Sequence, residues 1–228
     1  MKLTLATLAH NNFMGKDFVA RWALDEDRVL AASRGVGAER TLAARALLRA
    51  LLFRQAGDQD WRLQADDRGK PSLIARDGTA GPSVSLSHSG AMVAAALGPV
   101  GASLGVDLEA HKQRDVQALA AHAFGPAERQ RVAAGGAAVF FRLWTLREAM
   151  GKATGQGLSL AADGQDHLGE DGPHEGWWRQ PGWFLGHVTP CPGYSLAAAL
   201  MSPEDGMVEV EIISEDDLPH LPRHQPIT

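Results

Sequence analysis

One stretch of the chain, residues 140–158 (FFRLWTLREAMGKATGQGL), sets a carboxylate and an ammonium among aromatic side chains. On an α-helix, four of these side chains would share one face: Phe141, Trp144, Glu148 and Lys152. Solvated charged pairs usually lie opposite the apolar stripe of a helix, and Arg142 and Arg147 are available for that side. Glu148 and Lys152 are therefore expected on the wall of a cleft. The alternative is an ordinary i,i+4 surface pair that contributes about 0.3 to 0.5 kcal/mol and does nothing else.

Two further carboxylates lie close together in the segment Gly105-Val106-Asp107-Leu108-Glu109. The pattern of residues 100–108 predicts a strand, whose period of two sends Asp107 and Glu109 to one face. Neighbouring carboxylates repel, so this pair is stable only if it is exposed, protonated or bridged by a cation. Oxygen ligands on a strand suit Mg²⁺ whose coordination is completed by water and substrate phosphates. An exposed edge strand is the alternative.

Neutral groups that can bind phosphate are expected at Ser87 and His88. Residues 84–90 and 91–97 predict two strands that flank a tight polar turn, with Ser87 and His88 at the turn. A hydroxyl, an imidazole and backbone N–H groups beside a glycine suit a phosphate oxygen. A catalytic Ser-His pair is not expected, because adjacent residues of a strand point to opposite faces.

Two cations are candidate partners of such an anion. Lys70 stands before Pro71, which stiffens its backbone, although a plain surface turn is the default for Gly69-Lys70-Pro71. Arg40 lies near the start of a helix predicted over residues 38–53, on its apolar side. An inward Arg40 would need an anionic partner, whereas the alternative is a side chain that reaches solvent past the end of the core. On the same helix, Arg45 and Arg49 are expected on the opposite side.

The elements that must position these residues alternate between strands and helices. Strands are expected over residues 1–9, 84–90, 91–97, 100–108, 183–188, 195–200 and 208–213. Helices are expected over residues 38–53, 111–123 and from a break at 124–128 to a stop at Gly155. Residues 163–180 are expected to form a loop. The pattern indicates an α+β protein with two lobes, residues 1–100 and 101–213, and a flexible tail over residues 214–228; the cleft would lie where the lobes meet.

Composition narrows the function classes. The chain has 228 residues, 45% of them hydrophobic and 21% charged, which suits one large or two small soluble domains. A net charge of −5 argues against nucleic-acid binding through a general basic surface. The single cysteine, Cys191, excludes a disulfide framework, the nine histidines form no spaced zinc motif, and neither a membrane span nor a signal peptide is expected. A cytoplasmic protein fits these features.

Four motifs occur in order along the chain: Gly69-Lys70-Pro71, Leu86-Ser87-His88-Ser89, Gly105-Val106-Asp107-Leu108-Glu109, and Trp144-Thr145-Leu146-Arg147-Glu148-Ala149-Met150-Gly151-Lys152 followed by Gly155-x-Gly157-Leu158. Together they resemble the motifs of the 4'-phosphopantetheinyl transferases, in their larger, surfactin-synthetase-activating type. The resemblance spans about residues 38–200. The family usually has a lysine before the motif glutamate, and Arg147, which replaces it here, is expected at an exposed helix position.

The resemblance implies a monomer of two pseudo-twofold-related α/β lobes that bind coenzyme A and Mg²⁺ between them. Such an enzyme moves the 4'-phosphopantetheine arm to a serine of an apo acyl or peptidyl carrier protein and releases 3',5'-ADP, which is holo-carrier-protein synthase activity in fatty acid, polyketide or nonribosomal peptide biosynthesis. The implied metal ligands are Asp107, Glu109 and Glu148. The implied catalytic residues are Glu148, as the base for the serine hydroxyl, and Lys152. The residues implied in coenzyme A binding are Arg40, Lys70, Pro71, Ser87, His88, Asp107 and Lys152.

Two other function classes share some of these features. A Mg²⁺-dependent nucleotide or coenzyme A phosphohydrolase would use the same carboxylates, but it would cleave coenzyme A without a protein acceptor. A catalytically idle module that only binds carrier proteins would keep the fold and lose the metal.

Overall fold

The computed structural model describes residues 1–10, 13–57, 60–66, 69–169, 175–201, 207–213 and 217. Its mixture of helices and sheets agrees with the expected α+β class. The chain divides into two compact units: a first unit, Met1–Gly101 with Val208–Thr228, and a second unit, Ala102–Met207. Nearly all of the predicted tail lies outside the described residues.

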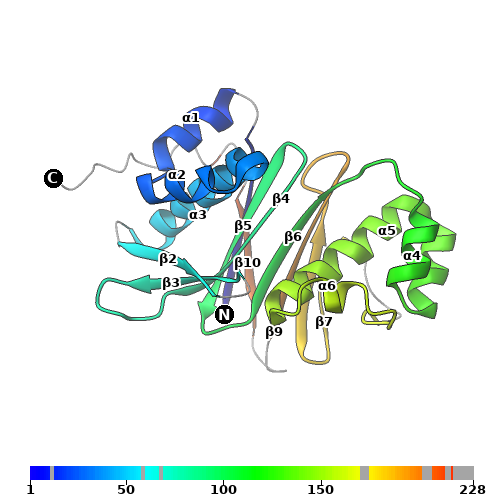
Figure 1. Cartoon of the computed structure of the whole chain (residues 1–228). Coiled ribbons are helices and arrows are strands. Elements are labelled where there is room, and N and C mark those ends of the chain that lie inside the picture. The colour runs from blue at the N-terminus through cyan, green and yellow to red at the C-terminus, as the bar shows by residue number, and fades with distance from the viewer. Residues whose placement is uncertain are drawn as a thin grey trace. The chain divides into compact units, whose positions relative to one another are not determined.

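The first unit contains a four-stranded sheet, a two-stranded hairpin and three α-helices (Figure 1). Its elements are β1 (Lys2–Ala9), α1 (Phe13–Trp22), α2 (Asp25–Ala32), the 3-10 turn η1 (Gly35–Gly37), α3 (Ala38–Ala56), β2 (Trp61–Ala65), β3 (Pro71–Ala75), β4 (Pro82–Ser89), β5 (Met92–Val100) and β10 (Glu209–Ile213). The sheet order is β10-β1-β5-β4, and β10 runs parallel to β1 while the other neighbours are antiparallel. Strands β2 and β3 form the hairpin.

Helix α3 forms where the sequence predicts it, because alanine and leucine dominate residues 38–56. Leu47 and Leu51 are buried in the core of the first unit with residues of β1 and β5. Arg45 and Arg49, which were expected on the side of the helix opposite Arg40, are not solvated there. Both are buried and bind the fully buried Asp27 of α2, with Arg45 Nε 2.5 Å from Asp27 Oδ1 and Arg49 Nε 3.2 Å from Asp27 Oδ2. Helix α2 packs on this side of α3. The hydrophobic pattern of α3 alone could not predict that another helix covers it.

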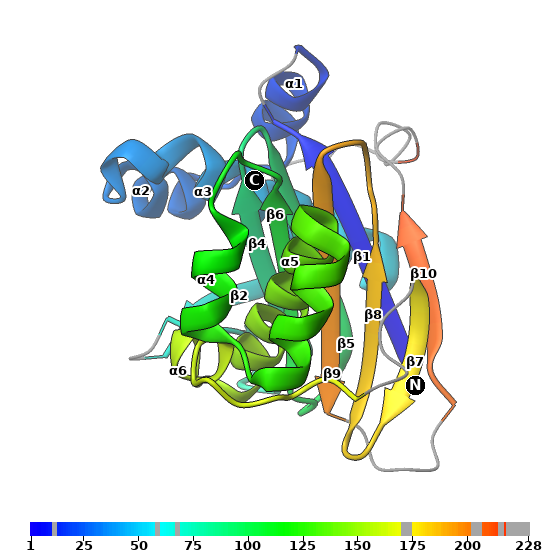
Figure 2. The same cartoon turned by 90° about the vertical axis from the view of Figure 1, so that its right-hand side faces the viewer.

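The second unit is a four-stranded antiparallel sheet with helices on one face (Figure 2). Its elements are β6 (Leu104–Ala110), α4 (Val116–Ala123), α5 (Pro126–Thr154), α6 (Leu158–Ala161), β7 (Gly176–Gln180), β8 (Trp183–Val188) and β9 (Tyr194–Met201). The strand order is β6-β9-β8-β7. Side chains of α4, α5, β8 and β9 share one hydrophobic core.

The boundaries of α5 follow the glycine and proline signals. Gly125 is the N-cap and Pro126 stands at N1, where its missing N–H costs nothing, and Gly155 ends the helix in the left-handed conformation (φ 74°). Both boundaries confirm the sequence-based prediction. Inside the helix, Gly136 has non-helical dihedrals (φ 63°, ψ −147°) and marks a kink.

Close packing of α5 on β6 depends on Gly105. A Cβ atom at this position would lie 1.9 Å from the carbonyl oxygen of Ala149 and 2.6 Å from the backbone nitrogen of Ala153. Only glycine lets the helix backbone approach the strand this closely. The approach brings the last turns of α5 next to Asp107.

Some elements depart from the prediction. Ser87 and His88 do not stand at the turn: β4 continues to Ser89, with Ser87 paired to Ala94 and His88 to Val93. Elements α1, α2, β2, β3, α6 and β7 were not predicted, and β7 lies within the expected loop 163–180. No helix in the described parts of the chain is long and apolar enough to cross a membrane.

Candidate functional site

Strand β6 and helix α5 place Asp107 and Lys152 in direct contact. Lys152 Nζ donates to Asp107 Oδ1 at 2.7 Å and to the carbonyl oxygen of Val106 at 3.1 Å. Asp107 is 5% exposed, whereas the side chain of Lys152 is 31% exposed. Lys152 therefore reaches across to the strand instead of forming only a surface pair with Glu148.

Glu148 lies in the same electrostatic environment. Its pKa is raised to about 7, first by burial and then by the negative charge of Asp107. Glu109 raises this pKa further and Lys152 opposes the rise. A carboxyl group with this pKa exchanges its proton near neutral pH, which is what a general base or acid needs.

The predicted metal ligands suit Mg²⁺ in chemistry but are not gathered as a ligand set. Asp107, Glu109 and Glu148 supply only carboxylate oxygens, the ligand type of Mg²⁺, and their mutual repulsion would be relieved by a cation. Within the described residues, however, no three His, Cys, Asp or Glu side chains form a group that could hold a metal ion. Lys152 binds one oxygen of Asp107 in this arrangement.

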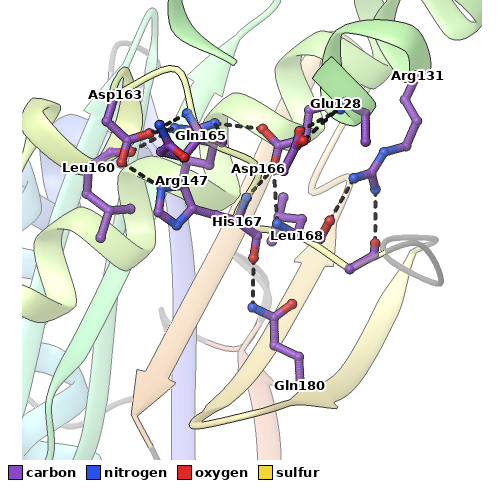
Figure 3. A network of polar contacts seen from close by, with 12 residues as sticks. Glu128, Arg131, Arg147, Leu160, Asp163, Gln165, Asp166, His167, Leu168 and Gln180 are labelled. Carbon is purple, nitrogen blue, oxygen red and sulfur yellow. Dashed lines mark hydrogen bonds and ion pairs between the residues drawn. The ribbon is translucent and has the colours of Figure 1, made fainter. Parts of the chain in front are cut away.

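Arg147 does not lie on the exposed surface where the sequence places it. Its side chain is fully buried, and its guanidinium forms ion pairs with Glu128 (2.6 Å) and Asp163 (2.8 Å) (Figure 3). It also lies 5.1 Å from the centre of the Phe124 ring, a cation–π contact. Residues 160–169, here called the covering segment, bury this side of α5, so the side that carries Arg147 is not solvated. Arg142 is only partly exposed.

The aromatic face of α5 is also more covered than expected. Phe141 is 1% exposed and stacks on His111, with ring centres 4.5 Å apart. His111 Nε2 lies 2.9 Å from Ser195 Oγ. Trp144 is half-buried and stacks on Phe140 at 6.1 Å. Phe141 is thus part of the core, and only the Glu148 end of the predicted face remains available for a ligand.

The other predicted site residues belong to the first unit. Arg40, in the first turn of α3, is half-exposed and is therefore not fully buried in the core of the first unit. Lys70 is partly buried in the β2–β3 hairpin, where its backbone nitrogen donates to Asp66 Oδ1 at 2.8 Å, and Pro71 begins β3. On β4, Ser87 is buried and His88 is exposed, as the alternation of a strand requires.

His187 of β8 is a buried titratable residue that the sequence did not single out. It is 4% exposed, and neither ring nitrogen has a hydrogen-bond partner among the described residues. Burial, aided by the charges of Arg142 and His111, lowers its pKa to about 4, and Glu175 partly opposes this. A single histidine within a strand forms no sequence motif, so the burial of His187 could not be predicted from the sequence.

Replacement of His187 by leucine should make stability less dependent on acid. The neutral ring is favoured in the fold, so its contribution is present above the unfolded pKa of about 6.5 and is lost as pH falls towards 4. The loss across this window is about 3 kcal/mol. Urea unfolding at pH 7 and pH 4.5 checks this, with His122→Leu on the exposed face of α4 as control. Equal acid sensitivity in parent and His187→Leu would contradict it.

Comparison with known proteins identifies the family of the chain. Residues 103–173, which contain β6, α5 and the covering segment, match the family model of the 4'-phosphopantetheinyl transferase superfamily. The chain belongs to this superfamily. It is 30% identical over 168 residues to the 4'-phosphopantetheinyl transferase HetI of Nostoc sp. (strain PCC 7120 / SAG 25.82 / UTEX 2576), covering 71% of this chain and 70% of that protein.

Proposed function

We propose that this protein transfers the 4'-phosphopantetheine arm of coenzyme A to a serine of an apo acyl or peptidyl carrier protein and releases 3',5'-ADP. The observation that carries the proposal is the partly buried Glu148, with its pKa near 7, beside Asp107 and Lys152 in a member of the superfamily. Such a carboxylate can take the proton of an alkyl hydroxyl at neutral pH.

The transfer needs one bond to form and one to break. The serine Oγ attacks the phosphorus that carries pantetheine, while the bond from that phosphorus to the bridging oxygen breaks and 3',5'-ADP leaves with the electron pair. Glu148 accepts the serine proton, since an uncharged hydroxyl is a weak nucleophile. Lys152, whose side chain remains partly exposed, neutralises charge on the phosphates.

Mg²⁺ would be held by Asp107, Glu109 and Glu148. When bound, Mg²⁺ neutralises the pyrophosphate and the departing 3',5'-ADP. The partly exposed side chain of Lys152, which pairs with Asp107 in this structure, would also be able to reach a phosphate oxygen. The same ion pair holds Asp107 in place beforehand.

Residues of the first unit would bind coenzyme A. Arg40, Lys70 and His88 retain exposure and carry donors for phosphate, with Pro71 fixing the backbone beside Lys70 and Ser87 adding a hydroxyl. We also propose the larger, surfactin-synthetase-activating type with pseudo-twofold lobes. The support is a shared connectivity: β1-β5-β4 and β6-β9-β8 have the same order and antiparallel sense, and a long helix follows the first strand of each.

We propose a cytoplasmic monomer whose partners are coenzyme A and a carrier protein, with no role for nucleic acid or membrane. The net charge of −5 supports the exclusion of nucleic acid.

Intact mass spectrometry tests the function. The protein is incubated with coenzyme A, Mg²⁺ and several apo carrier proteins, and a carrier should gain the mass of one phosphopantetheine arm. Cleavage of coenzyme A without any carrier would point to a phosphohydrolase. Binding of carrier proteins with no mass gain and no cleavage would indicate an idle binding module.

Variants that remove the positive charge of Arg40 or Lys70 test the role of these residues in coenzyme A binding. Arg40→Gln and Lys70→Gln should each weaken coenzyme A binding about tenfold to hundredfold, because a charge-assisted hydrogen bond contributes roughly 1.5 to 3 kcal/mol. Carrier affinity should change little. Calorimetry measures both affinities, and Arg76→Gln, which removes an exposed arginine paired with Asp60, is the matched control. Coenzyme affinity equal to that of the parent in both variants would leave Arg40 and Lys70 as surface residues.

A further inference from the structure

The covering segment is bonded to the beginning of α5. Asp166 caps the helix, accepting the backbone N–H groups of Ala127 (3.2 Å) and Glu128 (2.9 Å) (Figure 3). Arg131 donates to the carbonyl oxygens of Leu168 (2.7 Å) and Gly169 (3.1 Å). These contacts lie before the kink at Gly136, so they hold the first part of the helix.

A second set of contacts holds the part of α5 that lies beyond the kink. Arg147 Nη1 donates to Glu128 Oε2 (2.6 Å) and the carbonyl oxygen of Gln165 (2.8 Å). Arg147 Nη2 donates to the carbonyl oxygen of Leu160 (2.9 Å) and to Asp163 Oδ1 (2.8 Å). Four bonds in the plane of one guanidinium define its position and its orientation.

The acceptors are themselves fixed. Glu128 Oε1 accepts the backbone N–H groups of His167 (3.0 Å) and Leu168 (3.1 Å), and Glu128 is fully buried. Asp163 Oδ2 lies 2.8 Å from His167 Nε2. Arg147 is therefore held by a network that extends through the covering segment. Its partners are distant in the sequence: Glu128 lies 19 residues before Arg147, and Asp163 lies 16 residues after it.

We propose that Arg147 is a positioning residue for Glu148 and Lys152. The bound guanidinium sets the rotation and the axial position of the last turns of α5, whose other side rests on Gly105 of β6. Glu148 follows directly and Lys152 lies on the next turn, so a shift of the helix moves both charges relative to Asp107. This inference rests on the proposed function, in which a displacement of about 1 Å can slow a reaction about 10²-fold.

Lysine at position 147 isolates the positioning role. Arg147→Lys keeps the buried positive charge for Glu128, but an ammonium cannot hold four acceptors in one plane. Arg131→Lys is the matched control, because Arg131 binds the same covering segment from the other side of the kink. Single-turnover transfer is measured well below the unfolding temperature of each variant. At saturating coenzyme A, Arg147→Lys should transfer about tenfold more slowly, and Arg131→Lys should stay within about twofold of the parent.

The outcomes separate positioning from stability and from the function itself. A parent rate in Arg147→Lys overturns the inference, as does an equal loss in both variants. If Arg147→Lys does not fold, Asp163→Asn, whose side chain is 29% exposed, takes its place with the same expectation. If the parent chain transfers nothing, the proposed function fails, and crystal structures decide the inference: the Lys152–Asp107 distance should exceed about 4 Å in Arg147→Lys and stay below it in Arg131→Lys. An intact ion pair in Arg147→Lys would overturn the inference there too.

Discussion

Glu148→Gln will bind coenzyme A like the parent chain and transfer its phosphopantetheine arm at least about 10²-fold more slowly. Glutamine keeps the shape and one ligand oxygen of Glu148, but it is a negligible base. The side chain is partly buried, and its pKa of about 7 reflects burial and the neighbouring Asp107, so the parent carboxyl can accept a proton near neutral pH. The loss should therefore appear in the chemical step.

The pH dependence of transfer gives a second expectation for the same variant. A base acts when it is deprotonated, so the parent rate should rise with pH through the pKa of Glu148, near 7 in the absence of a cation. A bound cation stabilises the carboxylate and moves this limb to lower pH. Glu148→Gln should lose the limb.

Single-turnover transfer across a series of Mg²⁺ concentrations separates the two roles of Glu148. Rescue of Glu148→Gln to near the parent rate at high Mg²⁺ would show that the residue only binds metal, leaving water or another group as the base. The matched control is Glu209→Gln, which makes the same change at an exposed position of β10. Its rate should equal that of the parent.

Asp107→Ala should reduce transfer by at least about 10²-fold at limiting Mg²⁺ while the fold persists. The variant removes a proposed ligand and also the partner of Lys152, which is 2.7 Å away. An unpaired buried charge would destabilise the protein, but the side chain of Lys152 is 31% exposed and can reach solvent. The unfolding temperature of Asp107→Ala should therefore change little, although its transfer rate falls strongly.

The test of Asp107→Ala is transfer at limiting and saturating Mg²⁺, with binding of Mg²⁺ measured by calorimetry in the presence of coenzyme A. Asp17→Ala, on the exposed side of α1, controls for loss of a carboxylate elsewhere. A parent rate in Asp107→Ala at limiting Mg²⁺ would remove Asp107 from the metal site. A large drop in unfolding temperature with no change in Mg²⁺ binding would make its role structural.

The sequence predicted best where the signal is local. Alanine and leucine between residues 38 and 53 mark α3, and Gly125-Pro126 and Gly155 mark the ends of α5. These signals depend on backbone preference within a few residues. They needed no knowledge of what packs nearby.

The burial of arginines could not be predicted in this way. Arg147 was expected at an exposed position and Arg45 on the side away from the apolar residues of its helix, but their partners Glu128 and Asp27 lie 19 and 18 residues away in the sequence. A projection shows which residues share a face and not what covers it. Likewise, the contact between Lys152 and Asp107 spans 45 residues, so the sequence placed both in one site without indicating that they pair.

The parallel pairing of β10 with β1 has a consequence for synthesis of the chain on the ribosome. Lys2 pairs with Glu209, so one edge of β1 stays open until residues 209–213 have emerged, whereas residues 102–207 of the second unit are contiguous and can fold earlier. An open strand edge invites pairing with other nascent chains. Arrival of β10 ends that exposure, and the first sheet is thus completed only after the second unit has emerged.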